Sequence, residues 1–267
     1  RLVEVGTTNR SRFADYANAI ENDEDLALIL KVHRSNYEIV GFTEDVEVSA
    51  LRQLDVPIVA DIGSGLLDSA CPWLSGPPPK WLNDEPAARQ TLSAGADRVL
   101  FSGDKLFGGP QAGIIAGDRE LVERCGRHPL ARALRPGDLV LQALQATTMA
   151  YLDRRGDDIP FWRMASVDVS DLEARAKTIC DEVAVPAGGT EPQPVDTEAV
   201  PGGGTLPTVT FPSFGIKVDH DITEPLRAAD RPIVARVEQG STVLDLRTVF
   251  PDDDALIATA IESAIAR

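Results

Sequence analysis

The sequence has no long apolar run, few cysteines and few histidines. No stretch of about eighteen or more apolar residues occurs, so a membrane-spanning helix is not expected. The three cysteines, Cys71, Cys125 and Cys180, are far apart and form no CxxC pair. We therefore expect reduced thiols in a cytoplasmic protein rather than a disulfide framework. Three scattered histidines do not predict a metal site.

Basic residues are also scarce. The chain has 26 Lys and Arg against 42 Asp and Glu, which gives a formal net charge of −16. Such a surface repels phosphate backbones over most of its area. Any contact with nucleic acid must therefore use a local basic patch or a segment absent from this chain. The 43% hydrophobic content is ordinary for a globular protein with one large and one smaller core.

The first residues, Arg1 to Val5, lack both an initiator Met and the pattern of a signal peptide. They look like the middle of a strand. We therefore expect an upstream part of the protein to precede Arg1.

Short apolar strands alternate with helical patterns in the first half of the chain. The run Leu26 to Val32 has the length and continuous apolar character of a strand buried on both faces. Further strands are expected at 56–60, 98–101 and 112–116, and helices at 12–20, 44–54, 85–94, 119–126 and 138–152. This alternation predicts an α/β fold with a mainly parallel sheet and right-handed crossovers, in a large domain over residues 1–152.

The second half differs in composition. Residues 185–207 are rich in Gly, Pro, Thr and acidic residues without periodicity, which predicts a flexible linker or long loop. A strand near 208–211, a hairpin of 232–238 and 242–246, and a helix over 253–266 follow. We therefore expect a small α+β domain over residues 153–267.

Polar residues follow several of the expected strands. Asn36 lies in the His33-Arg34-Ser35-Asn36 segment after the first strand, Asp61 follows the second, and Ser102-Gly103-Asp104-Lys105 follows the third. Ligands of open parallel sheets bind beyond the carboxyl ends of the strands, where these side chains would meet.

This set suits pyridoxal 5′-phosphate (PLP), an aldehyde cofactor. A lysine such as Lys105 can form a Schiff base with the aldehyde and then move protons. A carboxylate such as Asp61 can pair with the pyridine nitrogen, Ser102 can bind the phosphate, and Asn36 can bind the ring 3-oxygen. Taken singly, a lysine after a strand is more often a surface charge, and an Asp there is more often a cap or turn residue. The ordered set, followed by Gly108-Gly109-Pro110, is more specific.

Arg132 and Arg135 form a second candidate site. Their spacing places both on one face of a helix, as a two-pronged anion site. A solvated basic face is the alternative that spacing alone favours.

Several motifs resemble bacterial selenocysteine synthase, the L-seryl-tRNA(Sec) selenium transferase family. They are EVGTTNR from Glu4, LKVHRSNYEIVGFT from Leu30, DIGSG from Asp61, FSGDKLFGGPQAGII from Phe101 and HPLARALR from His128. The segment VARVEQGSTVLDLRTV resembles the family's C-terminal strands. The similarity is dense from residue 1 to about 152 and thins until about 232.

The resemblance implies a PLP-dependent transferase of selenocysteine biosynthesis, with the aminotransferase-like fold type I. It would convert seryl-tRNA(Sec) to selenocysteinyl-tRNA(Sec) through an aminoacrylyl intermediate, with selenophosphate as the selenium donor. Lys105 would hold the cofactor and move protons, beside Asp61 and Ser102. Arg132 and Arg135 would bind the selenophosphate-like anion, and Asp104 would be a second catalytic residue.

The family carries a long portion before the EVGTTNR motif, with a tRNA-binding domain and the first half of the cofactor domain. The chain is therefore expected to be an N-terminally truncated member. The resemblance also implies a homo-oligomer, a ring of dimers with shared active sites.

Two alternatives stay open. The first is a PLP lyase or transferase acting on a free amino acid, in which Arg247 would hold the α-carboxylate. The second is a truncated copy that folds without catalysis.

Overall fold

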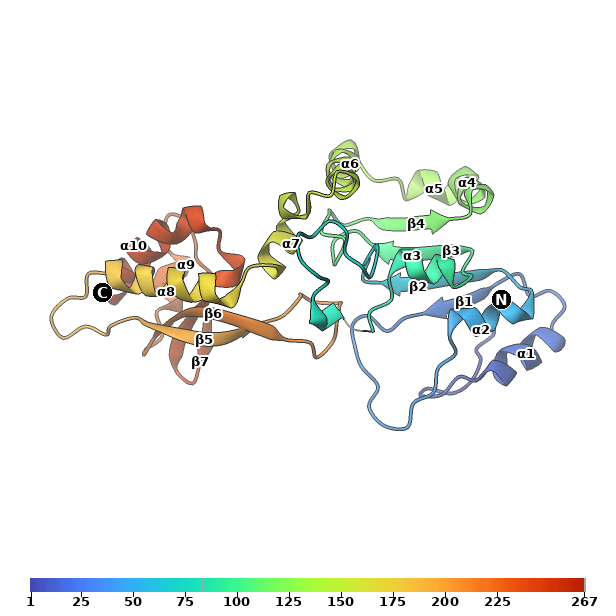
Figure 1. Cartoon of the computed structure of the whole chain (residues 1–267), viewed down its shortest axis with the longest axis horizontal. Coiled ribbons are helices and arrows are strands. Elements are labelled where there is room, and N and C mark those ends of the chain that lie inside the picture. The colour runs from blue at the N-terminus through green and yellow to red at the C-terminus, as the bar shows by residue number, and fades with distance from the viewer. Residues whose placement is uncertain (83, 267) are drawn as a thin grey trace. The chain divides into compact units, whose positions relative to one another are not determined.

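The computed structural model describes residues 1–82 and 84–266, which form two compact units. Unit 1 comprises residues 1–162 and 201–209, and unit 2 comprises residues 163–200 and 210–267. Figure 1 follows the chain through both units. The predicted division near residue 152 stays a prediction.

A four-stranded sheet forms the centre of unit 1, in the order β1-β2-β3-β4. Its strands are β1 (Ile29–Val32), β2 (Ile58–Gly63), β3 (Arg98–Ser102) and β4 (Gly113–Gly117). β1 pairs with β2 and β2 with β3 in parallel, whereas β4 runs antiparallel to β3. The prediction that all four strands belong to parallel units was therefore wrong for β4. Only about ten residues separate β3 from β4, too few for the helical crossover that a parallel pair needs.

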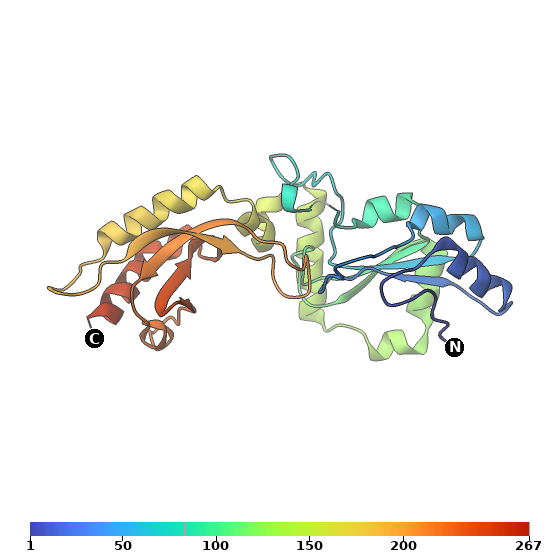
Figure 2. The same ribbon diagram turned by 90° about the horizontal axis from the view of Figure 1, so that it is seen from below.

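Six helices of unit 1 flank this sheet. They are α1 (Phe13–Glu21), α2 (Val48–Leu51), α3 (Ala88–Ser93), α4 (Arg119–Arg127), α5 (Pro129–Ala133) and α6 (Asp138–Leu152). Figure 2 shows α2 and α3 along one face of the sheet and α4 and α5 on the opposite side. The main core lies under α1 to α3, where Leu51, Ile58 and Val99 are fully buried.

Two predictions for the start of the sheet need correction. β1 was expected to be buried on both faces, but Leu30 and Val32 are 47% and 56% exposed. β1 is the first strand in the sheet order, and its side chains alternate between the core and solvent. The predicted helix over 44–54 is shorter, because residue 44 lies in an extended bridge with Arg10 and α2 begins at Val48.

Unit 2 is built on an antiparallel sheet with the order β5-β6-β8-β7. Its strands are β5 (Gln193–Ala199), β6 (Phe211–Val218), β7 (Arg236–Glu238) and β8 (Ser241–Asp245). α8 (Val169–Glu182) packs on this sheet and α10 (Asp254–Ile265) packs on α8, while α7 (Pro160–Ala165) and α9 (Thr223–Arg227) are short. Leu172, Ile216 and Ile261 are fully buried in this second core.

The predicted hairpin is present. β7 and β8 are joined by Gln239 and Gly240, whose φ angles of 53° and 84° suit a two-residue hairpin turn. The prediction of a linker over 185–207 was wrong for Gln193–Ala199, because β5 pairs along its whole length with β6. The strand was missed because β5 has few apolar residues. It lies at the edge of the sheet and pairs with one strand only, so few of its side chains are buried.

Candidate functional site

Three polar segments of unit 1 meet beyond the carboxyl ends of β1, β2 and β3. Ser35 follows β1, Gly63 ends β2, and Lys105 lies in the turn after β3. Because β1, β2 and β3 are mutually parallel, their carboxyl ends share one edge of the sheet. The hydrogen bond between the Lys105 and Ser35 side chains joins two of these segments, those after β1 and β3.

The Lys105 amine is held inside this edge. Its Nζ donates a hydrogen bond of 3.2 Å to Oγ of Ser35, which is itself buried. Lys105 is half-buried, so it is not the fully solvated surface charge that a lone lysine most often is. Ser35 was not among the predicted site residues, although it lies beside Asn36 in the HRSN segment.

The turn that carries Lys105 is tied to its surroundings by backbone hydrogen bonds. The Leu106 N–H donates to the Ser64 carbonyl at 2.8 Å, and the Gly108 N–H donates to the Lys105 carbonyl at 2.8 Å. The Gly109 N–H donates to the Gly103 carbonyl at 2.7 Å. Gly108 has a φ of 71°, which favours glycine and explains part of the Gly-Gly-Pro motif.

Two glycines pack closely against the Lys105 and Ser35 side chains. A Cβ atom added to Gly204 would lie 3.2 Å from Cε and 3.4 Å from Nζ of Lys105. A Cβ atom added to Gly63 would lie 2.6 Å from Oγ of Ser35 and 4.0 Å from Nζ of Lys105. Gly204 comes from the Gly202-Gly203-Gly204 run, which the sequence suggested only as part of a linker. Larger residues at either position would crowd the lysine.

Asp61 lies on β2, opposite Val32 of β1 and Leu100 of β3. Its Oδ1 accepts a hydrogen bond of 3.1 Å from the N–H of Gly63. The carboxylate is half-buried and bonded to the same glycine that approaches Lys105. This position suits a charge partner for a bound ring, and that role stays a prediction.

The other predicted residues of this edge lie less close to the amine. Ser102 is the last residue of β3 and is half-buried, whereas Asn36 and Asp104 are exposed. Within residues 1–82 and 84–266, the side chains of these three residues form no hydrogen bond to Lys105. Their roles towards the cofactor stay predictions.

Arg132 and Arg135 do not share a helical face. α5 ends at Ala133, so Arg132 is helical and Arg135 lies beyond the helix end. The prediction of one helix carrying both was wrong, because Pro136 directly follows Arg135 and disfavours a helical conformation for it. Both guanidinium groups are exposed, which keeps them available to an anion.

Tyr151 supports the lysine turn from α6, a contact that the sequence did not suggest. Its hydroxyl donates to the Phe107 carbonyl at 2.9 Å and accepts a hydrogen bond of 2.6 Å from Nε1 of Trp162. Burial raises the pKa of Tyr151, so the neutral hydroxyl is retained. The ring also stacks on Phe107, with 5.3 Å between centroids.

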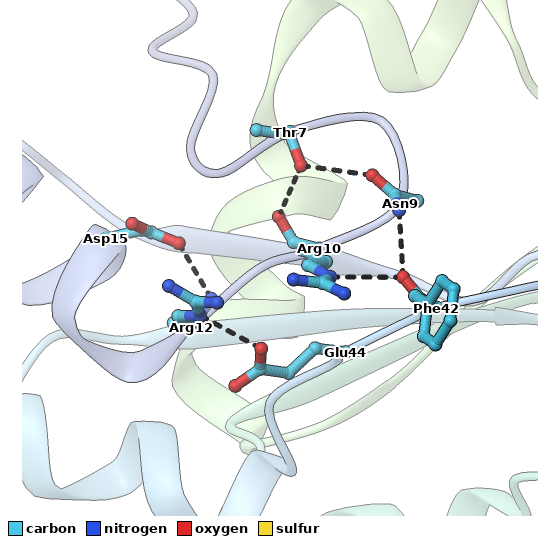
Figure 3. Close-up of polar contacts among 7 residues, drawn as sticks. All are labelled: Thr7, Asn9, Arg10, Arg12, Asp15, Phe42 and Glu44. Atoms are coloured by element: carbon cyan, nitrogen blue, oxygen red, sulfur yellow. Dashed lines mark hydrogen bonds and ion pairs between the residues drawn. The ribbon is translucent and has the colours of Figure 1, made fainter.

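The EVGTTNR and VGFT motifs lie side by side in the same unit (Figure 3). Asn9 Nδ2 and Arg10 Nε donate to the Phe42 carbonyl at 2.8 and 3.1 Å. Arg12 Nε forms an ion pair with Oε2 of Glu44 at 2.9 Å. Two motifs that are more than thirty residues apart in sequence therefore form one connected polar network.

Arg247 in unit 2 is not available to a substrate carboxylate. Its side chain is buried, and its guanidinium donates to the carbonyls of Met164, Val167 and Pro212 at 3.0, 2.8 and 2.6 Å. Burial lowers its pKa. The alternative in which Arg247 holds a free α-carboxylate is contradicted, because its guanidinium is buried and its NH1 and NH2 groups already donate to backbone carbonyls.

No described helix has the length and apolar character needed to cross a membrane. Among residues 1–82 and 84–266, no group of three or more His, Cys, Asp or Glu side chains is arranged to hold a metal ion.

Comparison with solved structures defines the fold class. D-Glucosaminate-6-phosphate ammonia-lyase superposes on the chain with a TM-score of 0.57 and 21% sequence identity. The match covers the whole of this chain and 64% of that protein. The fold is thus the α/β type that the sequence predicts for PLP-dependent transferases.

Comparison of sequences defines the family. The family model for L-seryl-tRNA selenium transferase matches residues 1–250, and the chain belongs to this family. It is 37% identical over 274 residues to L-seryl-tRNA(Sec) selenium transferase of Aquifex aeolicus, and 39% identical over 280 residues to that of Moorella thermoacetica. The matches cover 99% of this chain but 59% and 57% of those proteins. The chain therefore spans little more than half the length of these relatives.

Proposed function

We propose that this chain takes part in the PLP-dependent conversion of seryl-tRNA(Sec) to selenocysteinyl-tRNA(Sec), with selenophosphate as the selenium donor. The observation that carries the proposal is the Lys105 amine, half-buried and bonded to Ser35 at the carboxyl edge of the sheet. Family membership supports the substrate, because the related proteins are named for seryl-tRNA(Sec). The reaction would take place in the cytoplasm.

The residues around Lys105 fit PLP. The edge offers an amine for the aldehyde, the Asp61 carboxylate for the ring nitrogen, and the close approach of the Gly63 and Gly204 backbone to Ser35 and Lys105. The buried hydroxyls of Ser64 and Thr205, which neighbour these glycines, have no hydrogen-bond partner in the described chain. Buried hydroxyls without partners are unfavourable, so they suit a polar group of a bound molecule.

The chain's own residues would divide the work as follows. Ser35 orients the Lys105 amine, which carries the covalent link and moves a proton to and from the substrate. The Asp61 carboxylate keeps the ring nitrogen protonated, and Ser102 and Asn36 contribute polar contacts. When bound, PLP supplies the electron sink that loss of the seryl hydroxyl requires.

Arg132 and Arg135 would bind the selenophosphate anion through exposed guanidinium groups. Asp104, exposed beside Lys105, would assist as an acid or base. Replacing both arginines with alanine should lower the use of selenophosphate and leave the absorption band of the lysine-bound cofactor intact. Loss of that band would contradict the assignment.

We also propose a homo-oligomer built from dimers. Three large apolar side chains in and between α5 and α6 support a protein contact, because Leu130, Leu134 and Leu139 are 60%, 77% and 83% exposed. Light scattering on the purified chain should give a mass of at least a dimer. A monomer at all concentrations would contradict this part of the proposal.

The function is tested with the PLP-loaded chain, seryl-tRNA(Sec) and selenophosphate. Release of selenocysteine from the tRNA after hydrolysis is the expected result, and Lys105→Ala should abolish it. Free serine replaces seryl-tRNA(Sec) in a parallel reaction. Turnover of free serine alone would favour the alternative lyase or transferase, and unchanged seryl-tRNA(Sec) would contradict the proposal.

A further inference from the structure

A buried carboxylate oxygen without a partner lies close to the proposed site. The Glu85 side chain is 3% exposed, and its Oε2 lies 3.5 Å from Nε2 of His33. Within the described residues, Oε1 of Glu85 and Nε2 of His33 accept or donate no hydrogen bond. A carboxylate oxygen buried in this way is costly unless a donor reaches it. The pair therefore points to a ligand that donates a hydrogen bond to the Glu85 carboxylate.

Glu85 and His33 line a cavity of about 340 Å³ in unit 1. Leu206 and Pro207 give it apolar walls, and Tyr37, whose side chain is more than half exposed, adds an aromatic ring. The cavity thus combines one unsatisfied acceptor with flat apolar and aromatic surface.

The cavity adjoins the Lys105 edge through two short segments. His33 lies two residues before Ser35, which accepts the hydrogen bond from Lys105. Leu206 lies two residues after Gly204, which packs on the lysine side chain. A ligand in this cavity would therefore contact the same two segments that hold the amine.

The Leu206 segment is held in an unfavourable backbone conformation. Leu206 and Thr208 have φ angles of 47° and 66°, and Thr208 Oγ1 donates to Oε2 of Glu38 at 3.1 Å. Non-glycine residues adopt such angles at some energetic cost, which is frequent at binding sites.

We propose that this cavity binds the terminal ribonucleotide of the aminoacyl-tRNA, with the ribose 2′-hydroxyl donating to Glu85. The base would lie against Tyr37 and the Leu206-Pro207 wall, since aromatic and apolar surfaces bind bases by stacking. Arg34, which also lines the cavity, would face the single phosphodiester. This proposal rests on the proposed function and extends it to a specific part of the substrate.

Two other acidic residues, Glu38 and Asp84, also line the cavity. They repel a chain of phosphates, so the cavity should favour a nucleotide with one phosphate over a nucleoside triphosphate. A carboxylate on a ribose hydroxyl is a recurring mode of ribose recognition. The same contact would distinguish RNA from DNA.

The test compares adenosine 5′-monophosphate with its 2′-deoxy analogue by isothermal titration calorimetry on the whole chain. Wild-type protein should bind the ribonucleotide about tenfold more tightly, because a hydrogen bond to a charged group is lost with the hydroxyl. Glu85→Gln should reduce this ratio to about threefold or less. The 2′-hydroxyl strengthens binding through its hydrogen bond to the carboxylate, so its effect depends on the charge of Glu85. Glu120→Gln on α4, an exposed position, is the matched control and should keep the wild-type ratio.

Equal binding of the two nucleotides by wild-type protein would overturn the proposal. So would absence of binding at millimolar nucleotide, or an unchanged ratio in Glu85→Gln. The deoxy analogue probes the contact without any mutation, so a folding defect of the variant cannot hide the answer. Thermal unfolding of Glu85→Gln confirms that the variant is folded.

Competition by short RNAs distinguishes a tRNA end from a free nucleotide as the natural ligand. An RNA ending in CCA should compete with adenosine 5′-monophosphate, and the same RNA lacking the final adenosine should compete about tenfold less well. Tighter binding of adenosine triphosphate than of the RNA end would indicate a free-nucleotide site and overturn the proposal. Binding of PLP, measured by its visible absorption, is scored separately, so failure of the Lys105 site would be distinguished from failure of this cavity.

Discussion

Lys105 of unit 1 and Arg247 of unit 2 are held by contrasting sets of contacts. In unit 1, the half-buried Lys105 amine has one hydroxyl partner and lies close to two glycines. In unit 2, the Arg247 guanidinium donates to three backbone carbonyls and is enclosed by the fold. The first arrangement leaves a reactive group available to a ligand. The second uses a charged group to join backbone segments.

The sheets explain this difference. β1, β2 and β3 are parallel, so the segments after them gather at one edge and bring side chains from distant parts of the chain together. β5, β6, β8 and β7 are antiparallel, so successive strand ends alternate between the two edges of the sheet. The described strands of unit 2 therefore share no carboxyl edge like that of β1, β2 and β3.

The largest expected effect concerns Arg247. Arg247→Met removes the cation and leaves three carbonyls without their donor, which should lower the free energy of unfolding by about 3 kcal/mol or more. Urea unfolding followed by circular dichroism measures this change. Arg227→Met, at an exposed position on α9, should change it by less than about 0.5 kcal/mol. Equal effects of the two substitutions would remove the contrast between the units.

The next effect concerns the space beside Lys105. Gly204→Ala places a methyl group 3.2 Å from Cε of Lys105 and should weaken PLP binding about tenfold, because the lysine must shift. Gly202→Ala is the matched control. Gly202 also has a positive φ, of 122°, but an added Cβ meets no atom within 4 Å. Spectroscopic titration with PLP should separate the variants, and identical affinities would show that the close approach of Gly204 to Lys105 has no role in binding.

A smaller effect is expected for Tyr151. Tyr151→Phe removes the hydroxyl that joins Trp162 to the lysine turn, at an expected loss of about 1 to 2 kcal/mol in unfolding free energy. Tyr37→Phe, at an exposed ring, should change stability by less than about 0.5 kcal/mol. Denaturant unfolding monitored by tryptophan fluorescence is the measurement. A neutral Tyr151→Phe would mean that the turn is held by its backbone bonds alone.

The smallest effect is common to both units. Burial raises the pKa of Cys71 in unit 1 and of Cys180 in unit 2 to about 11, from about 9 in the unfolded chain. Since a raised folded pKa stabilises the protonated native state, this contribution is full below about pH 9 and is lost as pH rises through about 11. The midpoint of thermal unfolding should therefore fall over this window. The fall should be shallower in Cys71→Ala, and an unchanged slope would contradict the assignment for unit 1.

Much of unit 1 could be predicted from the sequence. The strands β1, β2 and β3 and the polar segments HRSN, DIGSG and SGDK after them follow from short apolar runs that end in polar residues. Lys105 could be selected because its neighbours, Ser102 and Gly108-Gly109, are the residues that a tight cofactor turn requires.

Other features depend on contacts that local patterns do not record. Ser35 rather than Asn36 contacts Lys105, because the path of the loop after β1 decides which neighbour points inward. Gly204 lies close to the Lys105 side chain, although it follows Lys105 by almost one hundred residues in the sequence. β5 lies in a polar edge position, where little burial leaves little hydrophobic pattern. The role of Arg247 in the fold could not be predicted, because its carbonyl partners come from two segments that lie far from it in the sequence.

The most direct test of the central claim is chemical trapping of PLP on the chain. The whole protein is incubated with PLP, reduced with borohydride, digested and analysed by mass spectrometry. The account predicts a single phosphopyridoxyl adduct on the peptide that contains Lys105, and its loss in Lys105→Ala. An adduct on other lysines with none on Lys105, or no adduct at saturating PLP, would contradict it.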